Sequence, residues 1–258
     1  MRHSEHSARP TAVALIPARA GSKRVQSKNT RRLAGHPLIA HTIAAAQSSG
    51  VFAAVVVSTE SEEIAAIARH YGAEVPFLRP LEFAGDRSPD IDWIEHTLRA
   101  LAVRGREFSV FSILRPTSPF RRAETIRRAF AEFTSHEGID SLRAVEKTSL
   151  HPGKMWVIRG ARLLPLLPFG PAEQPWHSSP TQSLPEVYVQ NASLEIAWSR
   201  LVLERHSIAG ETIVPFLTDS WEGFDINDPE DFARAERAVA ECQVECVPIL
   251  AAPFAPAE

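Results

Sequence analysis

The chain is poor in cysteine and contains no long hydrophobic run. Its only two cysteines are Cys242 and Cys246, so no disulfide framework is predicted and a reducing, cytoplasmic location is expected. No apolar run approaches the roughly 18 residues of a membrane helix, so we expect no membrane partner. Residues 1–10, MRHSEHSARP, lack the apolar core of a signal peptide.

Acidic residues are missing from one long stretch near the N-terminus. No Asp or Glu lies between His6 and Thr59, although these residues make up 31 of the 258 in the chain. The stretch includes a basic segment, residues 13–29, VALIPARAGSKRVQSKN. A net charge of −3 argues against a nucleic-acid partner, which calls for a broadly basic surface. A local positive charge instead indicates a small anionic ligand.

Lysine is scarce as well. Of the 28 Lys and Arg residues only four are lysines, and Lys23 and Lys28 both lie in the basic segment. A lysine kept where arginine is otherwise preferred suits a compact point charge on phosphate. The P-loop pattern G-x-x-x-x-G-K-[ST] and the dinucleotide pattern G-x-G-x-x-G are both absent. The ten histidines have no metal-ligand spacing.

The hydrophobic pattern predicts alternating strands and helices. Strands are expected at 13–16, 53–60, 73–77, 108–114, 187–198 and 212–217. Helices are expected at 37–47, around 64–71, from 88 to about 103, 122–133 and 229–241, with Pro37 and Pro89 in first turns. Continuous apolar strands between helices indicate an α/β fold with a mostly parallel sheet covered on both faces.

The pattern also suggests how the chain is divided. Residues 1–10 and 247–258 are predicted to be flexible ends, and residues 11–246 a single domain. Within that domain, residues 147–190 form a proline-rich, irregular stretch that is too long for an ordinary connection. We interpret this stretch as an extension that serves an interface or a substrate pocket.

The charged part of the basic segment follows the first strand directly, which is where ligands bind in doubly wound folds. Small residues there leave backbone N–H groups free to face an anion, and Gly21 permits positive φ or close approach. Lys23, Arg24 and Lys28 add full charges. Such a loop suits a triphosphate. The alternative is a basic turn that is merely solvated.

Several ordered motifs resemble one enzyme family. These are IPARAGSKRVQSKN, PLIAHTIAAAQSSGVF, VVVSTESEEIAAIARHYGAEVPFLRPLEFAGD, LRPTSPFR and FDINDPEDFARAE. Together they resemble the acylneuraminate cytidylyltransferases, which are the CMP-sialic, CMP-Kdo, CMP-pseudaminic and CMP-legionaminic acid synthetases. The resemblance implies a Rossmann-like nucleotidyltransferase fold, Mg²⁺, and a homodimer built through the extension. It implies a reaction in which a 2-keto sugar acid attacks the α-phosphate of CTP and releases pyrophosphate.

The resemblance also assigns roles by matching position. Lys28, Arg19 and Asp225 are the expected catalytic residues, with Lys28 neutralising the α-phosphate. The expected nucleotide-binding residues are Arg19, Ala20, Gly21, Ser22, Lys23, Lys28, Asn29 and Arg79. This agrees with the general view that nucleotidyl transfer depends mainly on positioning and charge stabilisation.

The segment GFDINDPEDF supplies candidate metal ligands. Asp228 before Pro229 is typical of a helix N-cap, so it has a sufficient structural explanation. Asp225 has none, and we assign it to Mg²⁺ together with Asn227, which stands where relatives often have Asp. The alternative is that Asp225 is only a loop or capping residue.

The acceptor side departs from the family pattern. The resemblance assigns it Arg115, Thr117, Ser118, Gln182 and Asn191. Arg115 replaces a common Gln, so it either binds a carboxylate or pairs with an acid such as Glu195. Two further readings stay open: transfer to another acceptor or from another nucleotide, and a catalytically weak protein that binds sugar nucleotides.

Overall fold

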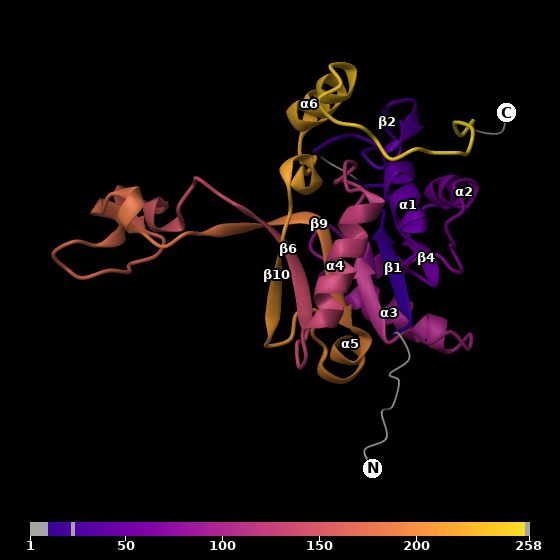
Figure 1. Cartoon of the computed structure of the whole chain (residues 1–258), viewed down its shortest axis with the longest axis horizontal. Helices are drawn as coiled ribbons and strands as arrows, with labels where there is room; N and C mark the ends of the chain where they lie inside the picture. The colour runs from indigo at the N-terminus through magenta and orange to yellow at the C-terminus, as the bar shows by residue number, and fades with distance from the viewer. Residues whose placement is uncertain (1–9, 22–23, 256–258) are drawn as a thin grey trace, which may run out of the picture. The chain divides into compact units, whose positions relative to one another are not determined.

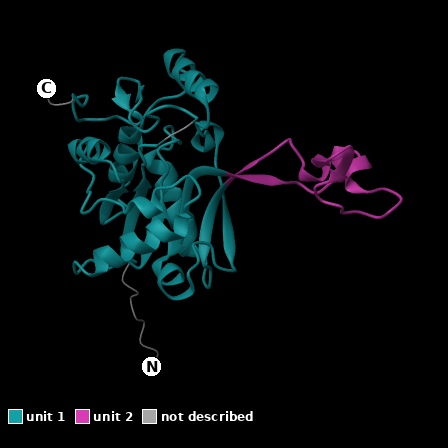
Figure 2. Ribbon diagram, turned by 180° about the vertical axis from the view of Figure 1, so that it is seen from behind, with its two compact units in different colours: residues 1–144, 191–258 teal, residues 145–190 magenta. Residues whose placement is uncertain are grey.

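The computed structural model describes residues 10–21 and 24–255. The chain divides into two compact units, coloured separately in Figure 2. Unit 1 comprises residues 1–144 and 191–258, and unit 2 comprises residues 145–190, which covers the predicted extension. No helix in the described part of the chain is long and apolar enough to cross a membrane.

The main sheet has six strands in the order β10–β6–β9–β5–β1–β4 (Figure 1). Its strands are β1 (Ala12–Pro17), β4 (Ala54–Ser58), β5 (Val110–Ile113), β6 (Ser141–Lys147), β9 (Tyr188–Trp198) and β10 (Ile213–Leu217). Strand β1 is parallel to β4 and β5, as predicted. Strand β5 is antiparallel to β9, so the sheet is mixed.

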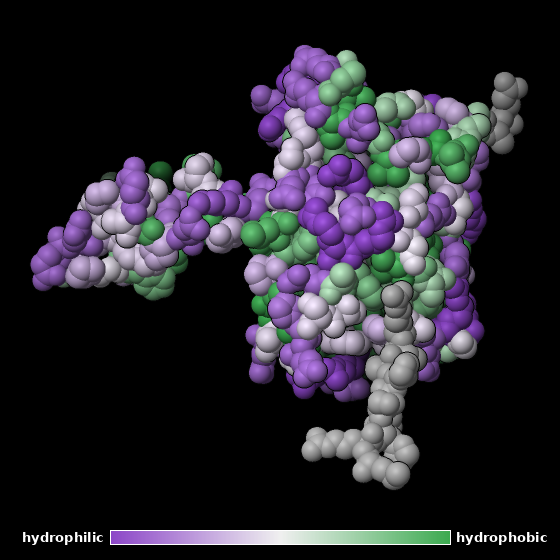
Figure 3. All heavy atoms as spheres, viewed as in Figure 1, coloured by the Kyte–Doolittle hydropathy of each residue, from purple (hydrophilic) through white to green (hydrophobic). Residues whose placement is uncertain are grey.

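Strand β1 is buried on both faces. Its side chains point alternately to the two faces of the sheet, so they contribute to two separate hydrophobic clusters. Ala14 and Ile16 contribute to the cluster beneath α1 (Leu38–Ser49), α2 (Glu62–His70) and α4 (Ala123–Ser135). Val13 and Leu15 contribute to the cluster beneath α3 (Asp90–Ala102) and α5 (Ser199–Arg205). The helices therefore cover both faces, and Figure 3 shows the outer surface of α4 as largely hydrophilic.

A third hydrophobic cluster lies beneath the basic segment. It joins Val25 and Leu33 to Ile226 and to Phe232 of α6 (Pro229–Ala240). Strands β2 (Arg32–Leu33) and β3 (His36–Pro37) form a small antiparallel hairpin above it. The hairpin turns through Ala34 and Gly35, both with positive φ, which is the backbone of a two-residue hairpin turn.

The predicted elements and the observed ones differ in two places. Residues 73–77 form no strand; Glu74 only makes an isolated parallel bridge with Val56. Pro37 and Pro89 occupy N-cap positions, one residue before the helices they precede. The strand predicted at 187–198 is present as the single long strand β9.

The C-terminal residues were predicted to be flexible, but the described part of this tail is packed. Val247 is buried, and Ile249 and Phe254 pack against the large core cluster. The backbone N–H of Phe254 donates to Oη of Tyr71 at 3.0 Å. Apolar residues at alternate positions of the tail pack against the hydrophobic core, which the sequence pattern did not predict.

Unit 2 consists of a hairpin and short 3₁₀ turns. The hairpin pairs β7 (Trp156–Arg159) with β8 (Arg162–Pro165), and the turns are η2 (Pro152–Lys154), η3 (Trp176–Ser178) and η4 (Thr181–Ser183). Every residue of β7 is exposed, including Ile158 at 76%. A small aromatic group holds the turns together, because Trp176 contacts the rings of both His151 and Phe169.

Candidate functional site

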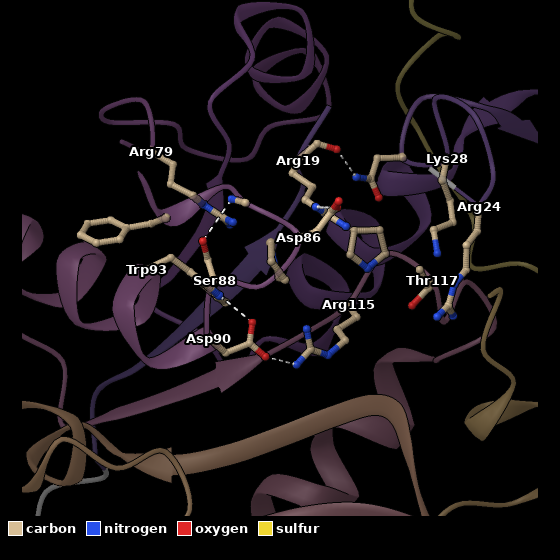
Figure 4. Close-up of a pocket in the computed structure, with 15 residues that line it drawn as sticks. Arg19, Arg24, Lys28, Arg79, Asp86, Ser88, Asp90, Trp93, Arg115 and Thr117 are labelled. Carbon is tan, nitrogen blue, oxygen red and sulfur yellow. Dashed lines mark hydrogen bonds and ion pairs between the residues drawn. The ribbon is translucent and has the colours of Figure 1, made fainter. Parts of the chain in front are cut away.

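A cavity of about 530 Å³ lies beside the ends of β1 and β5. Figure 4 shows side chains from three segments pointing into it: the basic segment, the stretch from Arg79 to Trp93, and the turn after β5. Its lining residues are Pro17, Arg19, Arg24, Lys28, Asn29, Arg79, Phe83, Gly85, Asp86, Ser88, Asp90, Trp93, Arg115, Pro116 and Thr117. The carboxyl ends of neighbouring parallel strands meet at one edge, which explains this convergence.

Arg19 lies two residues after β1 and lines the cavity. Its guanidinium pairs with Asp86 at 2.5 Å, and both side chains are about one-third exposed. The main-chain oxygen of Arg19 accepts from Nδ2 of Asn29 at 3.0 Å, which closes the segment on itself. The N–H of Ala20 donates to Oε1 of Glu60 at 2.7 Å. Side chains outside the segment therefore hold its shape.

Lys28 is the half-buried cation of the segment. Its Nζ donates to the main-chain oxygen of Ile226 at 2.9 Å. Burial lowers the pKa of Lys28; Asp225 opposes this effect, whereas the positive charges of Arg24 and Arg19 add to it. A desolvated ammonium in a cavity lined with other cations lacks a full counter-charge, so an anion bound there would be strongly favoured.

Arg79 is buried, with 6% exposure, and is held in a fixed position. Its Nε donates to Oγ of Ser58 at 2.9 Å and its Nη2 to the Ser58 carbonyl at 2.8 Å. The guanidinium also lies 4.8 Å from the ring centroid of Trp93. Burial lowers the pKa of Arg79 to about 10, although Glu60 and Asp90 oppose it. Its position in the cavity is therefore preset.

Arg115 lies in a chain of alternating charges. Its Nη2 donates to Oδ2 of Asp90 at 2.5 Å and to Oε1 of Glu195 at 3.3 Å. Arg143 of β6 pairs with the other oxygen of Glu195. Burial acts to lower the pKa of Arg115, but Asp90 and Glu195 outweigh it and the pKa is raised. The predicted pairing of Arg115 with an acid is therefore present.

The pairing restricts what else Arg115 can bind. An arginine grips a carboxylate bidentately through Nη2 together with either Nε or Nη1. Nη2 carries two hydrogens, and here both are directed to acids. A bidentate contact with a ligand carboxylate would therefore displace Asp90 or Glu195. With the chain intact, Arg115 offers single donors, which suit a neutral oxygen.

Arg121 is buried behind the turn that carries Arg115. Its side chain is 1% exposed, and its Nη2 donates to Oγ1 of Thr42 at 3.0 Å and to the Arg115 carbonyl at 3.2 Å. Its Nη1 donates to the carbonyl of Ser193 in β9. Burial lowers the pKa of Arg121. The guanidinium thus ties the turn that carries Arg115 to α1 and to β9.

Asp225 carries a carboxylate oxygen that is buried without a hydrogen bond from the described residues. Its Oδ1 is buried and has no hydrogen-bond partner in the described part of the chain. Asp225 acts on Lys28 electrostatically, so the two charges are neighbours. A carboxylate oxygen left without a partner fits Mg²⁺, which takes one or two carboxylates and completes its shell with water and phosphate. No described group of three or more His, Cys, Asp or Glu forms an all-protein metal cage.

The predicted site residues are not all in one place. Arg19, Lys28, Asn29, Arg79, Arg115 and Thr117 line the cavity, whereas Ala20, Gly21, Ser118, Asn191, Asp225 and Asn227 lie outside its lining. Gln182 lines a separate cavity of about 340 Å³ within unit 2. Ser22 and Lys23 lie outside the described residues.

Other predicted residues have local structural roles. Ser118 is buried, and the amide of Asn191 donates to Oγ1 of Thr218 at 2.8 Å. Asn227 is exposed, and its N–H donates to Asp231 at 2.9 Å, within the cap of α6. A Cβ added to Gly21 would meet no described atom within 4 Å, so the fold alone does not require glycine there.

Sequence reasoning missed the acidic side of the cavity. Asp86 and Asp90 lie in the stretch AGDRSPD, and both face arginines. Trp93 was also missed, although its Nε1 donates to Oδ1 of Asp90 at 2.8 Å. The only feature of the sequence that could have indicated these site residues is a pair of acids just before a helix, and that pattern is equally typical of a helix cap.

Comparison with known proteins gives a consistent family. The family model named Cytidylyltransferase matches residues 13–144. The CMP-N,N'-diacetyllegionaminic acid synthase of Legionella pneumophila is 41% identical over an alignment of 232 positions, and the match covers 87% of this chain and 94% of that relative. The N-acylneuraminate cytidylyltransferase of Escherichia coli O18:K1:H7 is 32% identical over 88% of this chain, and the match covers 52% of that protein.

Solved structures agree at the level of the fold. A CMP:2-keto-3-deoxy-manno-octonic acid synthetase complexed with CTP aligns with a TM-score of 0.65 and 17% identity, covering 90% of this chain and 99% of that one. The 4-diphosphocytidyl-2C-methyl-D-erythritol synthase from Anaerococcus prevotii aligns with a TM-score of 0.62 and 12% identity, with the same coverage. The chain therefore has the fold of these nucleotidyltransferases, and it belongs to the cytidylyltransferase family.

Proposed function

We propose that this enzyme transfers CMP from CTP to the anomeric hydroxyl of a 2-keto sugar acid of the nonulosonic type. The observation that carries the proposal is the convergence of Arg19, Arg24, Lys28 and Arg79 on one cavity. Its volume of about 530 Å³ suits a ligand of nucleotide size. The names of the relatives, which are synthetases of CMP-linked sugar acids, support the acceptor class.

The chemistry needs charge stabilisation more than covalent assistance. The hydroxyl oxygen of the acceptor bonds to the α-phosphorus as the bond to the bridging oxygen breaks, pyrophosphate leaves and the hydroxyl proton is released. Negative charge grows on the phosphate oxygens during this exchange. Lys28, half-buried and already fixed to Ile226, is preorganised to stabilise that charge. Arg19 supplies a second cation in the lining of the cavity.

We further propose that Asp225 holds Mg²⁺, with Asn227 as a neutral second ligand. The support is the buried, unpartnered Oδ1 of Asp225 beside the half-buried Lys28. When bound, the ion supplies charge neutralisation across the phosphates of the nucleotide. Asn227 would add an amide oxygen without charge, so one full carboxylate, rather than two, would come from this segment.

On the acceptor side, we propose that Arg115 and Thr117 contact a neutral part of the sugar. The reason is that Nη2 of Arg115 donates to Asp90 and Glu195, so it is not free to bind a ligand carboxylate bidentately. The predicted contributions of Ser118, Gln182 and Asn191 remain part of the proposal. Gln182 has a setting compatible with a polar ligand, since it lines a cavity with Lys147 and His151 in unit 2.

We also propose a homodimer that forms through unit 2. The support is that its hairpin exposes apolar side chains, namely Trp156, Ile158 and Leu163 on one face and Leu164 on the other. Exposed patches of this kind mark association sites in soluble proteins. Sedimentation of the purified chain should give a dimer, and Ile158→Asp should give a monomer. A wild-type monomer at micromolar concentration would contradict this part of the proposal.

The function is tested by pyrophosphate release in the presence of Mg²⁺, with each of the four ribonucleoside triphosphates against a panel of sugar acids and neutral sugar phosphates. We expect release only with CTP and a 2-keto sugar acid. Release with another nucleotide or with a sugar phosphate would favour a different nucleotidyltransferase. Absence of release with every pair, together with measurable CMP-sugar binding, would favour a binding protein.

A further inference from the structure

The residues after α6 cross unit 1 towards α2, as Figure 1 shows in yellow. We call residues 244–254 the C-terminal strap. Val244 packs against the cluster that contains Val25 of the basic segment. Val247 is buried in the large core, and Ile249 and Phe254 pack against it. The strap is thus anchored along its length, beginning directly beneath the cation-bearing segment.

The last residues of the strap are held by side chains near the β2–β3 hairpin. The N–H of Phe254 donates to Oη of Tyr71 at 3.0 Å, and its carbonyl accepts from Nη2 of Arg32 at 2.8 Å. Nε2 of His70 lies 2.8 Å from the carbonyl of Ala252. Both polar groups of the Phe254 backbone are therefore satisfied by side chains rather than by secondary structure.

Tyr71 connects the strap to the second strand of the hairpin. Its Oη lies 3.1 Å from Nδ1 of His36. Because Oη already accepts the N–H of Phe254, its own proton is available for His36. Burial lowers the pKa of His36, and Arg32 and His70 add to this effect, so a neutral imidazole can accept that proton. One hydroxyl therefore bridges the strap and the hairpin.

The hairpin in turn holds the basic segment. Immediately after it, the N–H of Leu38 donates to Arg31 at 2.9 Å and the N–H of Ile39 donates to Asn29 at 3.1 Å. Asn29 donates through its amide to the carbonyl of Arg19 at 3.0 Å. Hydrogen bonds joined by short pieces of backbone therefore connect the strap, through the hairpin, to the first cation of the cavity.

We propose that the C-terminal strap, through Tyr71, positions the basic segment for triphosphate binding. This inference rests on the proposed function for its ligand. Arg19, Arg24 and Lys28 repel one another, so the segment needs external restraint to keep them around one cavity. Without the strap, a smaller fraction of molecules would hold the binding geometry, and the apparent affinity for the nucleotide would fall in proportion.

The first test is limited proteolysis of Tyr71→Phe, which removes only the bridging hydroxyl. Trypsin cleaves after Arg and Lys, and residues 19–32 contain several such sites. We expect cleavage within 19–32, mapped by mass spectrometry, to become at least about threefold faster, and CTP to slow it again. Tyr188→Phe is the matched control, because Tyr188 in unit 2 is the only other tyrosine.

The second test is steady-state kinetics on the same variants. In Tyr71→Phe the KM for CTP should rise by about threefold or more, while kcat at saturating CTP stays within about twofold, because bound nucleotide restores the segment. A purely structural role for the strap would lower the melting temperature and leave the KM unchanged. Tyr188→Phe should change neither quantity.

Arg32→Gln provides a second variant, in case loss of the Tyr71 hydroxyl prevents folding. Arg32 is exposed, and its substitution removes the hydrogen bonds to the strap and to Gly35 together with a charge near His36. Because it also removes one trypsin site, cleavage is compared at the sites from Arg19 to Arg31, which all the chains share. Unchanged cleavage at these sites in both variants would overturn the inference. If the wild-type chain uses no CTP, the proposed function fails, and cleavage without nucleotide still decides whether the strap restrains the segment.

Discussion

Nζ of Lys28 donates to the main-chain oxygen of Ile226 at 2.9 Å, across 198 positions of sequence. This contact places the half-buried cation of the N-terminal segment against the C-terminal segment that carries Asp225. Burial lowers the pKa of Lys28 and Asp225 partly offsets it, so the two residues form one electrostatic unit. A phosphate chain bound between them would meet a cation and a candidate metal ligand together.

Lys28→Ala should reduce kcat at saturating CTP by about 100-fold, the usual cost of losing one preorganised donor to developing charge. The readout is pyrophosphate release at saturating concentrations of both substrates. Arg127→Ala, which removes an exposed cation on α4, should leave kcat unchanged. Undiminished turnover in Lys28→Ala would remove its proposed role in the transition state.

Asp225→Asn should raise the Mg²⁺ concentration required for half-maximal activity by about tenfold, because a charged ligand becomes neutral. Asp228→Asn is the matched control: Asp228 caps α6 through two backbone N–H groups, and Asn caps helices equally well. An identical Mg²⁺ dependence in the Asp225 variant and the wild type would contradict the metal assignment.

Glu195→Gln should destabilise the fold by about 3 kcal/mol, because Arg143 and Arg115 lose a buried counter-charge. Urea unfolding measures the change. In a double-mutant cycle, Arg143→Gln combined with Glu195→Gln should cost clearly less than the sum of the single changes. Additive costs would mean that the Arg143–Glu195 pair contributes no coupling.

Stability should fall as the pH drops below about 6.5. Burial lowers the pKa of both His36 and His41, so the unfolded chain binds more protons than the folded chain in this range. The stabilising contribution is complete above the unfolded pKa and is lost on acidification. The difference between the unfolding free energies at pH 7.5 and pH 5.5 should be smaller in His41→Gln than in the wild type. Equal differences in the two proteins would contradict the assignment.

Local patterns were sufficient for most of the elements. The continuous apolar runs at β1, β4 and β5 predicted buried parallel strands, and the helix face of Ile64, Ile67 and Ala68 was also found buried. These signals are local, because burial on both faces of a strand requires a continuous apolar run and burial on one face of a helix requires apolar residues three and four positions apart. Residues 73–77 look like a strand but have only one partner residue, so the pattern misled there.

The cationic part of the cavity was also readable from the sequence. An acid-free stretch with Arg19 and Lys28 directly after the first strand indicates a phosphate site, since position and charge both follow from chain order. The resemblance to the cytidylyltransferases then supplied a specific reaction, and comparison with known proteins confirmed the family. The roles given to individual residues stay predictions.

Only the tertiary structure decided how the charges pair. Arg115 could have faced a ligand carboxylate, but Asp90 and Glu195, which are 25 and 80 positions away, meet its Nη2. The packing of the strap against Tyr71 was equally invisible in the sequence. Periodicity and composition record which residues are buried or charged. They do not record which distant partner satisfies each polar group, because that choice is made only when strand order brings remote segments to the same edge of the sheet.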